Sequence, residues 1–340
     1  MFIMRFIILL FAVIGIQCSN AQKISYQRAS SSYIRSVSVD VDAKIRSVDL
    51  TDYLPKGYVT NGSVDYTSYL QRGINENLKV SMPNFPVLVN DNGLNLKSNM
   101  TVAFPSKSEL RLKPTAKGTY AILRIRNVNN IKILNPRLVG DRDKHIGNKG
   151  EWGMGIDIRG AQNVSVFNVN IKDCWGDGIY IGHSGTPSSN ISINGGVIDN
   201  NRRNGVSVVS VNGLNINKLL ISNSIGVNPA TGLDFEPNSH ANEIDNVIVK
   251  DLITFNNMKN GILIHLDKLI GENEKNVNVQ FENYKDFNSS RPVRVTGQLK
   301  NQNKPFRKIK GEIIFNGSNF SGNKSSSAIK ADAYFPKVKM

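Results

Sequence analysis

The sequence predicts an all-β fold in which a single chain winds into a parallel solenoid behind a short N-terminal helix. Two observations carry this prediction: a segment of the form glycine, apolar, any, apolar occurs five times, and a second short apolar strand accompanies it at a roughly constant offset. A repeat this short cannot bury its own apolar side chains. Neighbouring repeats must therefore stack, which pairs their strands in parallel.

The first strand column begins at a glycine in each repeat. Its segments start at positions 155, 178, 205, 232 and 261, at intervals of 23 to 29 residues. A second column opens with Asn at 130, 163, 190 and 246 and with Leu at 214. Asn and Gly at such corners suit tight turns that need a positive φ. Leucine-rich repeats are the alternative, but their Leu spacing and helical return segment are absent.

The chain ahead of the repeats begins with a predicted signal peptide, residues 1–21. Arg5 precedes the apolar run 6–16, and the small residues Ser19 and Ala21 predict cleavage before Gln22. Lipid attachment through Cys18 is the alternative, although the residue before it is a bulky Gln. The protein is thus expected to be secreted, to the periplasm or beyond the cell.

Residues 22–60 show no clean helical period, and we expect an irregular or edge-strand leader there, followed by the solenoid domain over 61–340. One amphipathic helix is predicted over 65–78. Asp65 suits an N-cap, and Tyr66, Tyr69, Leu70 and Ile74 fall on one face. Such a helix would cover the open end of the first coil.

Composition and charge limit the class of partner. Of 340 residues, 40% are hydrophobic and 20% charged, enough to bury one substantial core, and the net charge of +15 favours polyanions. No helix-turn-helix pattern, zinc spacing or aromatic-rich basic sheet motif supports nucleic acid. No segment after the first 21 residues approaches the ~20 apolar residues of a membrane helix. An acidic or sulfated polysaccharide fits best, with a basic surface lacking any specific ligand as the alternative.

The chain from about 65 to 260 resembles the pectin-lyase-like β-helix superfamily, nearest to its polygalacturonase-like branch. The likeness lies in the predicted helix, the segments 80–83 and 93–102, the Asn130 strand and the Gly178 coil. The resemblance implies a right-handed parallel β-helix that acts on a polysaccharide.

The same resemblance marks Asp177 as a catalytic candidate. The segment 176–178 stands where polygalacturonases carry Gly-Asp-Asp, but here the second Asp is replaced, and the Gly-His-Gly and Arg-Ile-Lys motifs are absent. A turn-forming role is the alternative, because Asp177 precedes a repeat glycine as Asn204 and Asn260 do.

Side chains alternate along a strand, so the apolar pair of each glycine segment faces the interior and the residue between them faces outward. The predicted interior stack contains Ile156, Ile158, Ile179, Ile181, Val206, Val208, Leu233, Phe235, Ile262 and Ile264. One outward column then contains Arg124, Asp157, Tyr180, Ser207, Asp234 and Leu263, and its neighbour contains Arg126, Arg159, Gly182, Val209, Glu236 and His265. At about 4.8 Å per coil, Arg124 and Asp234 are about 19 Å apart, room for several sugars.

Asp234 and Glu236 are the predicted catalytic acid and base. Outward carboxylates at i and i+2 lie about 6 to 7 Å apart at the backbone, near the separation of an inverting glycosidase. Their repulsion would raise one pKa, as a general acid requires. Simple solvation of an exposed strand is the alternative, and other rotamers would allow a retaining scheme.

Eight further residues are predicted to bind substrate. Arg159 beside Asp157 suits a clamp on a carboxylate or sulfate, with a local ion pair as the alternative. Arg202 and Arg203 could hold an anionic sugar or supply the base of a lyase, with a solvated turn as the alternative. Trp152 ends the insertion 141–152 and could stack on a sugar or pack a corner. The full set is Trp152, Asp157, Arg159, Tyr180, His183, Arg202, Arg203 and His265.

We therefore expect a secreted glycoside hydrolase acting on an acidic or sulfated polysaccharide. A polysaccharide lyase or epimerase, in which an Arg, Lys or His abstracts the proton α to a uronate carboxylate, is the runner-up. A non-catalytic glycan-binding β-helix is the third reading. No residue spacing predicts a metal or cofactor, although scattered Asp residues leave calcium open.

Overall fold

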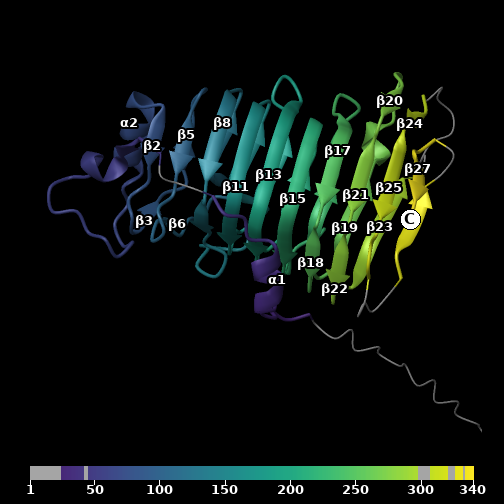
Figure 1. Cartoon of the computed structure of the whole chain (residues 1–340), viewed down its shortest axis with the longest axis horizontal. Coiled ribbons are helices and arrows are strands. Elements are labelled where there is room, and N and C mark those ends of the chain that lie inside the picture. The colour runs from purple at the N-terminus through teal and green to yellow at the C-terminus, as the bar shows by residue number, and fades with distance from the viewer. Residues whose placement is uncertain (1–23, 42–44, 298–306, 321–325, 332–333) are drawn as a thin grey trace, which may run out of the picture.

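The computed structural model describes residues 24–41, 45–297, 307–320, 326–331 and 334–340. They form a right-handed parallel β-helix whose coils follow one another along the long axis of the molecule (Figure 1). The predicted fold class is confirmed. The predicted signal peptide and Cys18 lie outside the described residues.

Three sheets account for the strands of the described residues, and they pair in parallel. One sheet carries the predicted glycine column: β4 (Leu94–Asn95), β7 (Thr119–Arg126), β10 (Trp152–Arg159), β12 (Ile179–Gly182), β14 (Val206–Val208), β16 (Thr231–Phe235), β19 (Asn260–His265), β23 (Arg291–Gly297) and β26 (Ala328–Ala331). We call it the front sheet. A small sheet pairs β20 (Lys275–Asn276) with β24 (Ile309–Lys310).

The largest sheet wraps the rest of each coil. Its main path is β1 (Val48–Asp49), β2 (Lys79–Ser81), β5 (Thr101–Ala103), β8 (Asn129–Leu134), β11 (Gln162–Lys172), β13 (Ser188–Asp199), β15 (Val211–Ser222), β17 (Ile244–Lys250), β21 (Val279–Glu282), β25 (Glu312–Asn316) and β27 (Lys337–Lys339). Its branches are β3 (Pro86–Val89), β6 (Glu109–Leu112), β9 (Arg137–Val139), β18 (Ile253–Phe255) and β22 (Lys285–Phe287). We call it the rear sheet.

The coil corners depend on asparagine, as predicted. Asn130, Asn163 and Asn190 have φ of 57°, 56° and 52°. Their side chains form a ladder in which each amide nitrogen donates to the amide oxygen of the preceding coil, at 3.0 and 3.1 Å. Asn168, with φ of 52°, bends β11 midway, so that this strand pairs first with β8 and then with β9.

The repeat glycines are needed because the backbones of successive coils approach closely. A Cβ on Gly178 would lie 2.7 Å from the carbonyl oxygen of Gly205, and one on Gly205 would lie 2.8 Å from that of Gly232. The amide of the next residue donates to the same carbonyl, as Ile179 does to Gly205 at 3.0 Å. The glycine column therefore sets the coil spacing of the front sheet.

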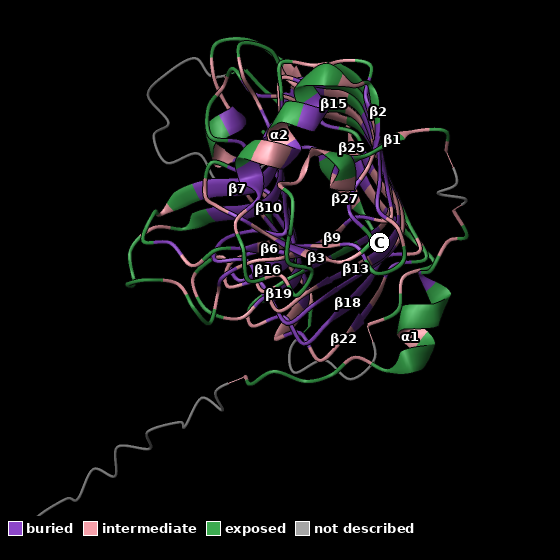
Figure 2. Ribbon diagram, turned by 90° about the vertical axis from the view of Figure 1, so that its left-hand side faces the viewer, coloured by how far each residue is buried: buried purple, intermediate pink, exposed green. Residues whose placement is uncertain are grey.

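The interior is apolar along the whole stack, and buried residues line the strands in the view along the axis (Figure 2). Each predicted interior residue is buried: Ile156, Ile158, Ile179, Ile181, Val206, Val208, Leu233, Phe235, Ile262 and Ile264. Strand pairing places them in two vertical columns, which confirms the predicted register.

Helix α2 (Thr67–Glu76) lies at the N-terminal end of the stack (Figure 1). It is shorter at both ends than the predicted 65–78, because its caps are Tyr66 and Asn77. Asp65, the predicted N-cap, lies one residue before Tyr66 and accepts a hydrogen bond from the Thr67 amide at 3.0 Å. Leu70 and Ile74 are fully buried in the main core, as their spacing predicted.

The leader contains more structure than expected. Strand β1 pairs with β2 as an edge strand, as anticipated, and is followed by the 3-10 helix η1 (Leu50–Tyr53). Helix α1 (Ser31–Ser36) was not predicted. Tyr33 stacks on Phe287 with ring centroids 4.8 Å apart, so the helix depends on a contact distant in sequence that no local period reveals. A second 3-10 helix, η2 (Asp267–Leu269), follows β19.

Candidate functional site

The outward column of the front sheet is assembled in the predicted register. Asp157 pairs with Tyr180, Tyr180 with Ser207, and Ser207 with Asp234 on successive strands. These four side chains face away from the core, yet all are buried. Flanking side chains cover them: Arg126 and Arg159 contact Asp157, and Asn204 contacts Asp234.

A cleft of about 560 Å³ lies over this column. Six of the predicted site residues line it: Trp152, Arg159, Tyr180, Arg203, Asp234 and Glu236. Five residues not predicted for the site complete the lining: Thr119, Glu151, Ser207, Val209 and Asn238.

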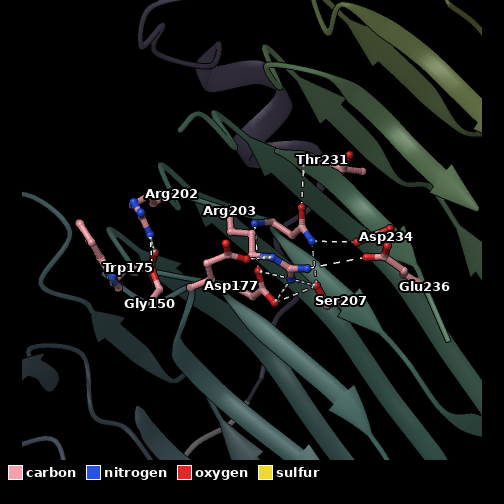
Figure 3. Close-up of polar contacts among 11 residues, drawn as sticks. Gly150, Trp175, Asp177, Arg202, Arg203, Ser207, Thr231, Asp234 and Glu236 are labelled. Atoms are coloured by element: carbon pink, nitrogen blue, oxygen red, sulfur yellow. Dashed lines mark hydrogen bonds and ion pairs between the residues drawn. The ribbon is translucent and has the colours of Figure 1, made fainter. Parts of the chain in front are cut away.

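Arg203 is the central cation of the cleft (Figure 3). Its Nη1 lies 2.9 Å from Asp177 Oδ2, its Nη2 3.7 Å from Glu236 Oε2, and its Nε 3.8 Å from Glu151 Oε2. Burial disfavours its charge, but the surrounding carboxylates more than offset burial and raise the pKa of Arg203. The guanidinium therefore stays charged and links the floor of the cleft to its rim.

Asp177 forms an ion pair with Arg203 that fixes the position of the guanidinium. Its side chain is fully buried and accepts hydrogen bonds from Arg203, from the Ser207 hydroxyl at 2.9 Å and from the Asn204 amide at 3.1 Å. Burial raises the pKa of Asp177, against the opposing effects of Arg203 and these hydrogen bonds. Both oxygens are engaged, so Asp177 is a positioning residue. The catalytic role implied by the family resemblance does not fit this geometry.

Asp234 forms the acidic floor. Asn204 Nδ2 donates to its Oδ2 at 2.9 Å, while Oδ1 is buried without a hydrogen-bond partner in the described part of the chain. Burial first, and the nearby charge of Glu236 second, raise the pKa of Asp234 well above its usual range. A buried carboxyl with a raised pKa and the partly exposed Glu236, whose side chain is 38% exposed, thus line the same cleft.

The loop before Gly205 places these groups by stacking on the loop of the preceding coil. The Arg203 amide donates to the Gly176 carbonyl at 3.1 Å, and Asn204 Oδ1 accepts from the Thr231 amide at 3.0 Å. Asn204 therefore bridges three successive coils. Its place before a repeat glycine, like that of Asp177, was visible in the sequence and could have marked it.

Asp157 belongs to an ion-pair cluster and does not reach the cleft. It accepts from Arg126 Nε at 2.6 Å and from Arg159 Nε at 2.7 Å, and its side chain is fully buried. The local-pair alternative for Asp157 is correct. Arg159 still lines the cleft, with its guanidinium 4.1 Å from the centre of the Tyr180 ring. Asp157 thus orients Arg159, as Asp177 orients Arg203.

The end of the insertion 141–152 contributes Glu151 and Trp152 to the lining of the cleft. His145 anchors the insertion, with Nδ1 2.8 Å from Asp141 Oδ2 and its ring stacked on Trp175 at 3.9 Å. Trp152 is 50% exposed and lines the cleft. The two tryptophans, equivalent in sequence, therefore differ: Trp175 packs a corner and Trp152 faces the site.

Three predicted residues lie elsewhere. Arg202 points away from Arg203 (Figure 3), donates to the Gly150 carbonyl at 2.9 Å and lies 3.7 Å from the centre of the Trp175 ring. His265 Nε2 lies 3.5 Å from Asp267 Oδ2 on a later coil. Neither of these residues nor His183 is in the lining of the cleft. Arg202 therefore braces the insertion and does not face the site.

The described residues contain no group of three or more His, Cys, Asp or Glu side chains arranged to hold a metal ion. Within the same ranges, no helix is long and apolar enough to cross a membrane.

Comparison with known proteins identifies the architecture. The chain matches no protein-family model. A curated relative, the SPbeta prophage-derived uncharacterized protein YorA of Bacillus subtilis, is 28% identical over 162 residues, which cover 42% of this chain and 28% of YorA. The match thus spans just over a quarter of the relative.

Three solved structures share the fold. The tailspike of Escherichia coli bacteriophage HK620 in complex with a hexasaccharide has a TM-score of 0.62 and 14% identity, covering 86% of this chain and 55% of the tailspike. PfbA, a surface adhesin of Streptococcus pneumoniae, has a TM-score of 0.59 and 12% identity, with coverages of 86% and 76%. An iota-carrageenase complexed to iota-carrageenan fragments has a TM-score of 0.55 and 14% identity, with coverages of 80% and 61%. At these identities the similarity concerns the fold alone.

Proposed function

We propose that this protein is a glycoside hydrolase that cleaves a polysaccharide in the cleft over Asp234 and Glu236. The observation that carries the proposal is the contrast between two neighbouring carboxyl groups. Asp234 is buried with a raised pKa, while Glu236 is partly exposed at the cleft wall. Carboxyl groups in environments that separate their protonation states are typical of the acid and base of a glycosidase.

In the proposed reaction, Asp234 donates its proton to the glycosidic oxygen as the bond to the anomeric carbon breaks. Glu236 accepts a proton from the water that attacks the same carbon, so the two products leave with one proton each and the carboxyl groups exchange protonation states. Arg203 orients Glu236 through an ion pair in which its Nη2 lies 3.7 Å from Glu236 Oε2. Trp152 and the Arg159 and Tyr180 pair offer the flanking surfaces for sugars.

The cleft favours hydrolysis over β-elimination. A lyase needs a base that is deprotonated before it abstracts the proton from the sugar. The carboxylates around Arg203 raise the pKa of Arg203, and burial raises the pKa of Tyr180, so both side chains keep their protons more tightly. Burial lowers the pKa of Arg202, but its guanidinium lies on Trp175. Arg203 and Tyr180 are therefore poor proton acceptors.

A non-catalytic glycan-binding protein is the second candidate, and the depth of Asp234 favours it. Its exposed fraction is 1%, and a general acid must reach the glycosidic oxygen. Both candidates are consistent with export through the predicted signal peptide and with membership of the pectin-lyase-like superfamily, which we retain as proposals.

The test is incubation of the purified protein with uronate-containing, sulfated and neutral polysaccharides, following reducing ends and ultraviolet absorbance together. The proposal predicts reducing ends without new absorbance. Absorbance rising with reducing ends would identify a lyase, because elimination leaves an unsaturated sugar. Binding by affinity electrophoresis without either signal would identify a binding protein.

A further inference from the structure

A second cleft lies over the front sheet on the coils that follow Asp234, and all its charged residues are positive. Its volume is about 560 Å³, and its lining is Asn228, Pro229, Met258, Lys259, Asn260, Leu263, Ser290, Arg291 and Arg294. An adjoining hollow of about 210 Å³ shares Arg291 and Arg294 and adds Lys330. The two linings contain four cations and no carboxylate, unlike the first cleft. We call this surface the basic cleft.

The register connects the two clefts. Asp234 pairs with Leu263, and Leu263 pairs with Arg294 on the next strand. Arg294 thus lies two strand spacings, about 10 Å, from Asp234 in the same outward column. A polysaccharide lying across the coils would meet both groups, with only a few sugars between them.

The position before each repeat glycine continues in the same way. Thr231 pairs with Asn260, and Asn260 pairs with Arg291. Asn204 occupies this position one coil before Thr231 and holds Asp234. This position therefore holds Asn204, which binds Asp234, in the first cleft and the cation Arg291 in the basic cleft.

Two buried polar atoms of the basic cleft lack partners within the described residues. Arg291 Nε has no acceptor, and Asn260 Oδ1 has no donor, although Asn260 is only 3% exposed. A buried polar group without a hydrogen bond is costly, so these atoms mark places where a ligand would contribute. One requires an acceptor and the other a donor.

The chemistry of these groups identifies the ligand class. A sulfate or carboxylate accepts hydrogen bonds from guanidinium groups, and a sugar hydroxyl can donate to an amide oxygen. Among the ion pairs of the described residues, none involves Lys259, Arg291, Arg294 or Lys330. Their charge is therefore not balanced by an ion pair within the described residues.

We propose that the basic cleft is a subsite for an anionic sugar of the same polysaccharide chain that enters the Asp234 cleft. This inference rests on the proposed function and makes it specific, because it assigns a sulfate or carboxylate to a sugar a short distance from the point of cleavage. Arg291 and Arg294 bind the anionic group, and Asn260 Oδ1 accepts a hydrogen bond from a hydroxyl of the same sugar.

The test measures binding without turnover, so that it stands apart from the test of hydrolysis. Affinity electrophoresis would compare the parent protein with the double variant Arg291→Gln/Arg294→Gln, using dextran sulfate, polygalacturonate and neutral dextran as probes. The control is Lys79→Gln/Lys107→Gln, which removes two charges from exposed positions of the rear-sheet side. Circular dichroism would confirm that each variant is folded.

We expect the arginine variant to lose about tenfold or more in affinity for one of the two anionic probes, since it loses charged hydrogen bonds to the anionic group. The probe that responds identifies sulfate or carboxylate. The lysine control should change affinity less than about twofold, because salt screens the attraction between exposed lysines and a bound polyanion. Equal losses in both variants, or unchanged affinity of the arginine variant for both anionic probes, would overturn the proposal.

The binding result and the cleavage result separate the two proposals. Loss of binding in the arginine variant with no cleavage by the parent protein would refute hydrolysis and support the subsite on a binding protein. Cleavage by the parent protein with unchanged binding in the arginine variant would refute the subsite alone.

Discussion

Replacing Arg203 with glutamine removes the cation that neutralises a buried carboxylate. Among the described residues, Arg203 is the cation within ion-pair distance of Asp177, at 2.9 Å, and the Asp177 side chain is fully buried. Removing one partner of a buried pair costs about 3 to 5 kcal/mol. Glu236 and Glu151 add little, because they lie at 3.7 and 3.8 Å and are 38% and 51% exposed. We expect a loss of about 3 to 5 kcal/mol in the free energy of unfolding.

Urea unfolding would measure this loss beside a matched variant. Arg126→Gln also removes an arginine from a buried carboxylate, but Asp157 keeps Arg159 as a second partner at 2.7 Å. We expect that variant to lose only about 1 kcal/mol, because Arg126 is itself 45% exposed.

A double variant tests the cause. Asp177→Asn/Arg203→Gln removes both charges, so no buried charge is left unpaired, and most of the stability lost in Arg203→Gln should return. The reasoning would be refuted if Arg203→Gln cost no more than Arg126→Gln, or if the double variant lost the sum of its two single losses.

Three further outcomes follow from buried and exposed features of the chain. Burial raises the pKa of Asp286 to about 7, so the folded state binds its proton more tightly than the unfolded state does, and stability should fall as pH rises from about 4 through 7. Asp286→Asn should flatten this fall in Tm between about pH 4 and 7, and an unchanged slope would contradict it. Gly205→Ala should cost about 1 to 3 kcal/mol in urea unfolding, because the new Cβ would lie 2.0 Å from Ile221 Cγ2; an unchanged midpoint would be inconsistent with the close coil spacing. Trp152→Ala should weaken polysaccharide binding in affinity electrophoresis while changing stability by less than about 0.5 kcal/mol, and full retention of affinity would remove Trp152 from the site.

The coil register was predictable because its causes are local. Four of the five repeat glycines face a carbonyl of the next coil, Gly261 instead faces side-chain oxygens, and each apolar pair follows from strand alternation. The same alternation placed Asp157, Tyr180 and Asp234 in one outward column, and their pairing confirms it.

The burial of that column was not predictable, because its cover comes from other coils. Asp157 is enclosed by Arg126, 31 positions earlier in the chain, and Asp234 is held by Asn204, 30 positions earlier. Such contacts depend on which rotamer each long side chain adopts after the coils have stacked.

Adjacent residues show the same limit. Arg202 and Arg203 are adjacent residues of the same type. In the structure, the Arg202 guanidinium packs on Trp175 away from the cleft, whereas the Arg203 guanidinium pairs with Asp177 and lines the cleft. Ser207 was placed in the outward column but not assigned to the site, because a small hydroxyl gives no signal without its acceptor. Its bond to Asp177 appears only in the folded chain.

Asp234 and Glu236 are the residues that we propose cleave a glycosidic bond. The most direct measurement is the release of reducing ends from a polysaccharide that the parent protein degrades, compared among the parent, Asp234→Asn, Glu236→Gln and the exposed control Glu272→Gln. We expect each cleft variant to lose at least about a hundredfold in rate, as removal of a general acid or base does, while the control keeps the parent rate. Parent-like release by both cleft variants would contradict it.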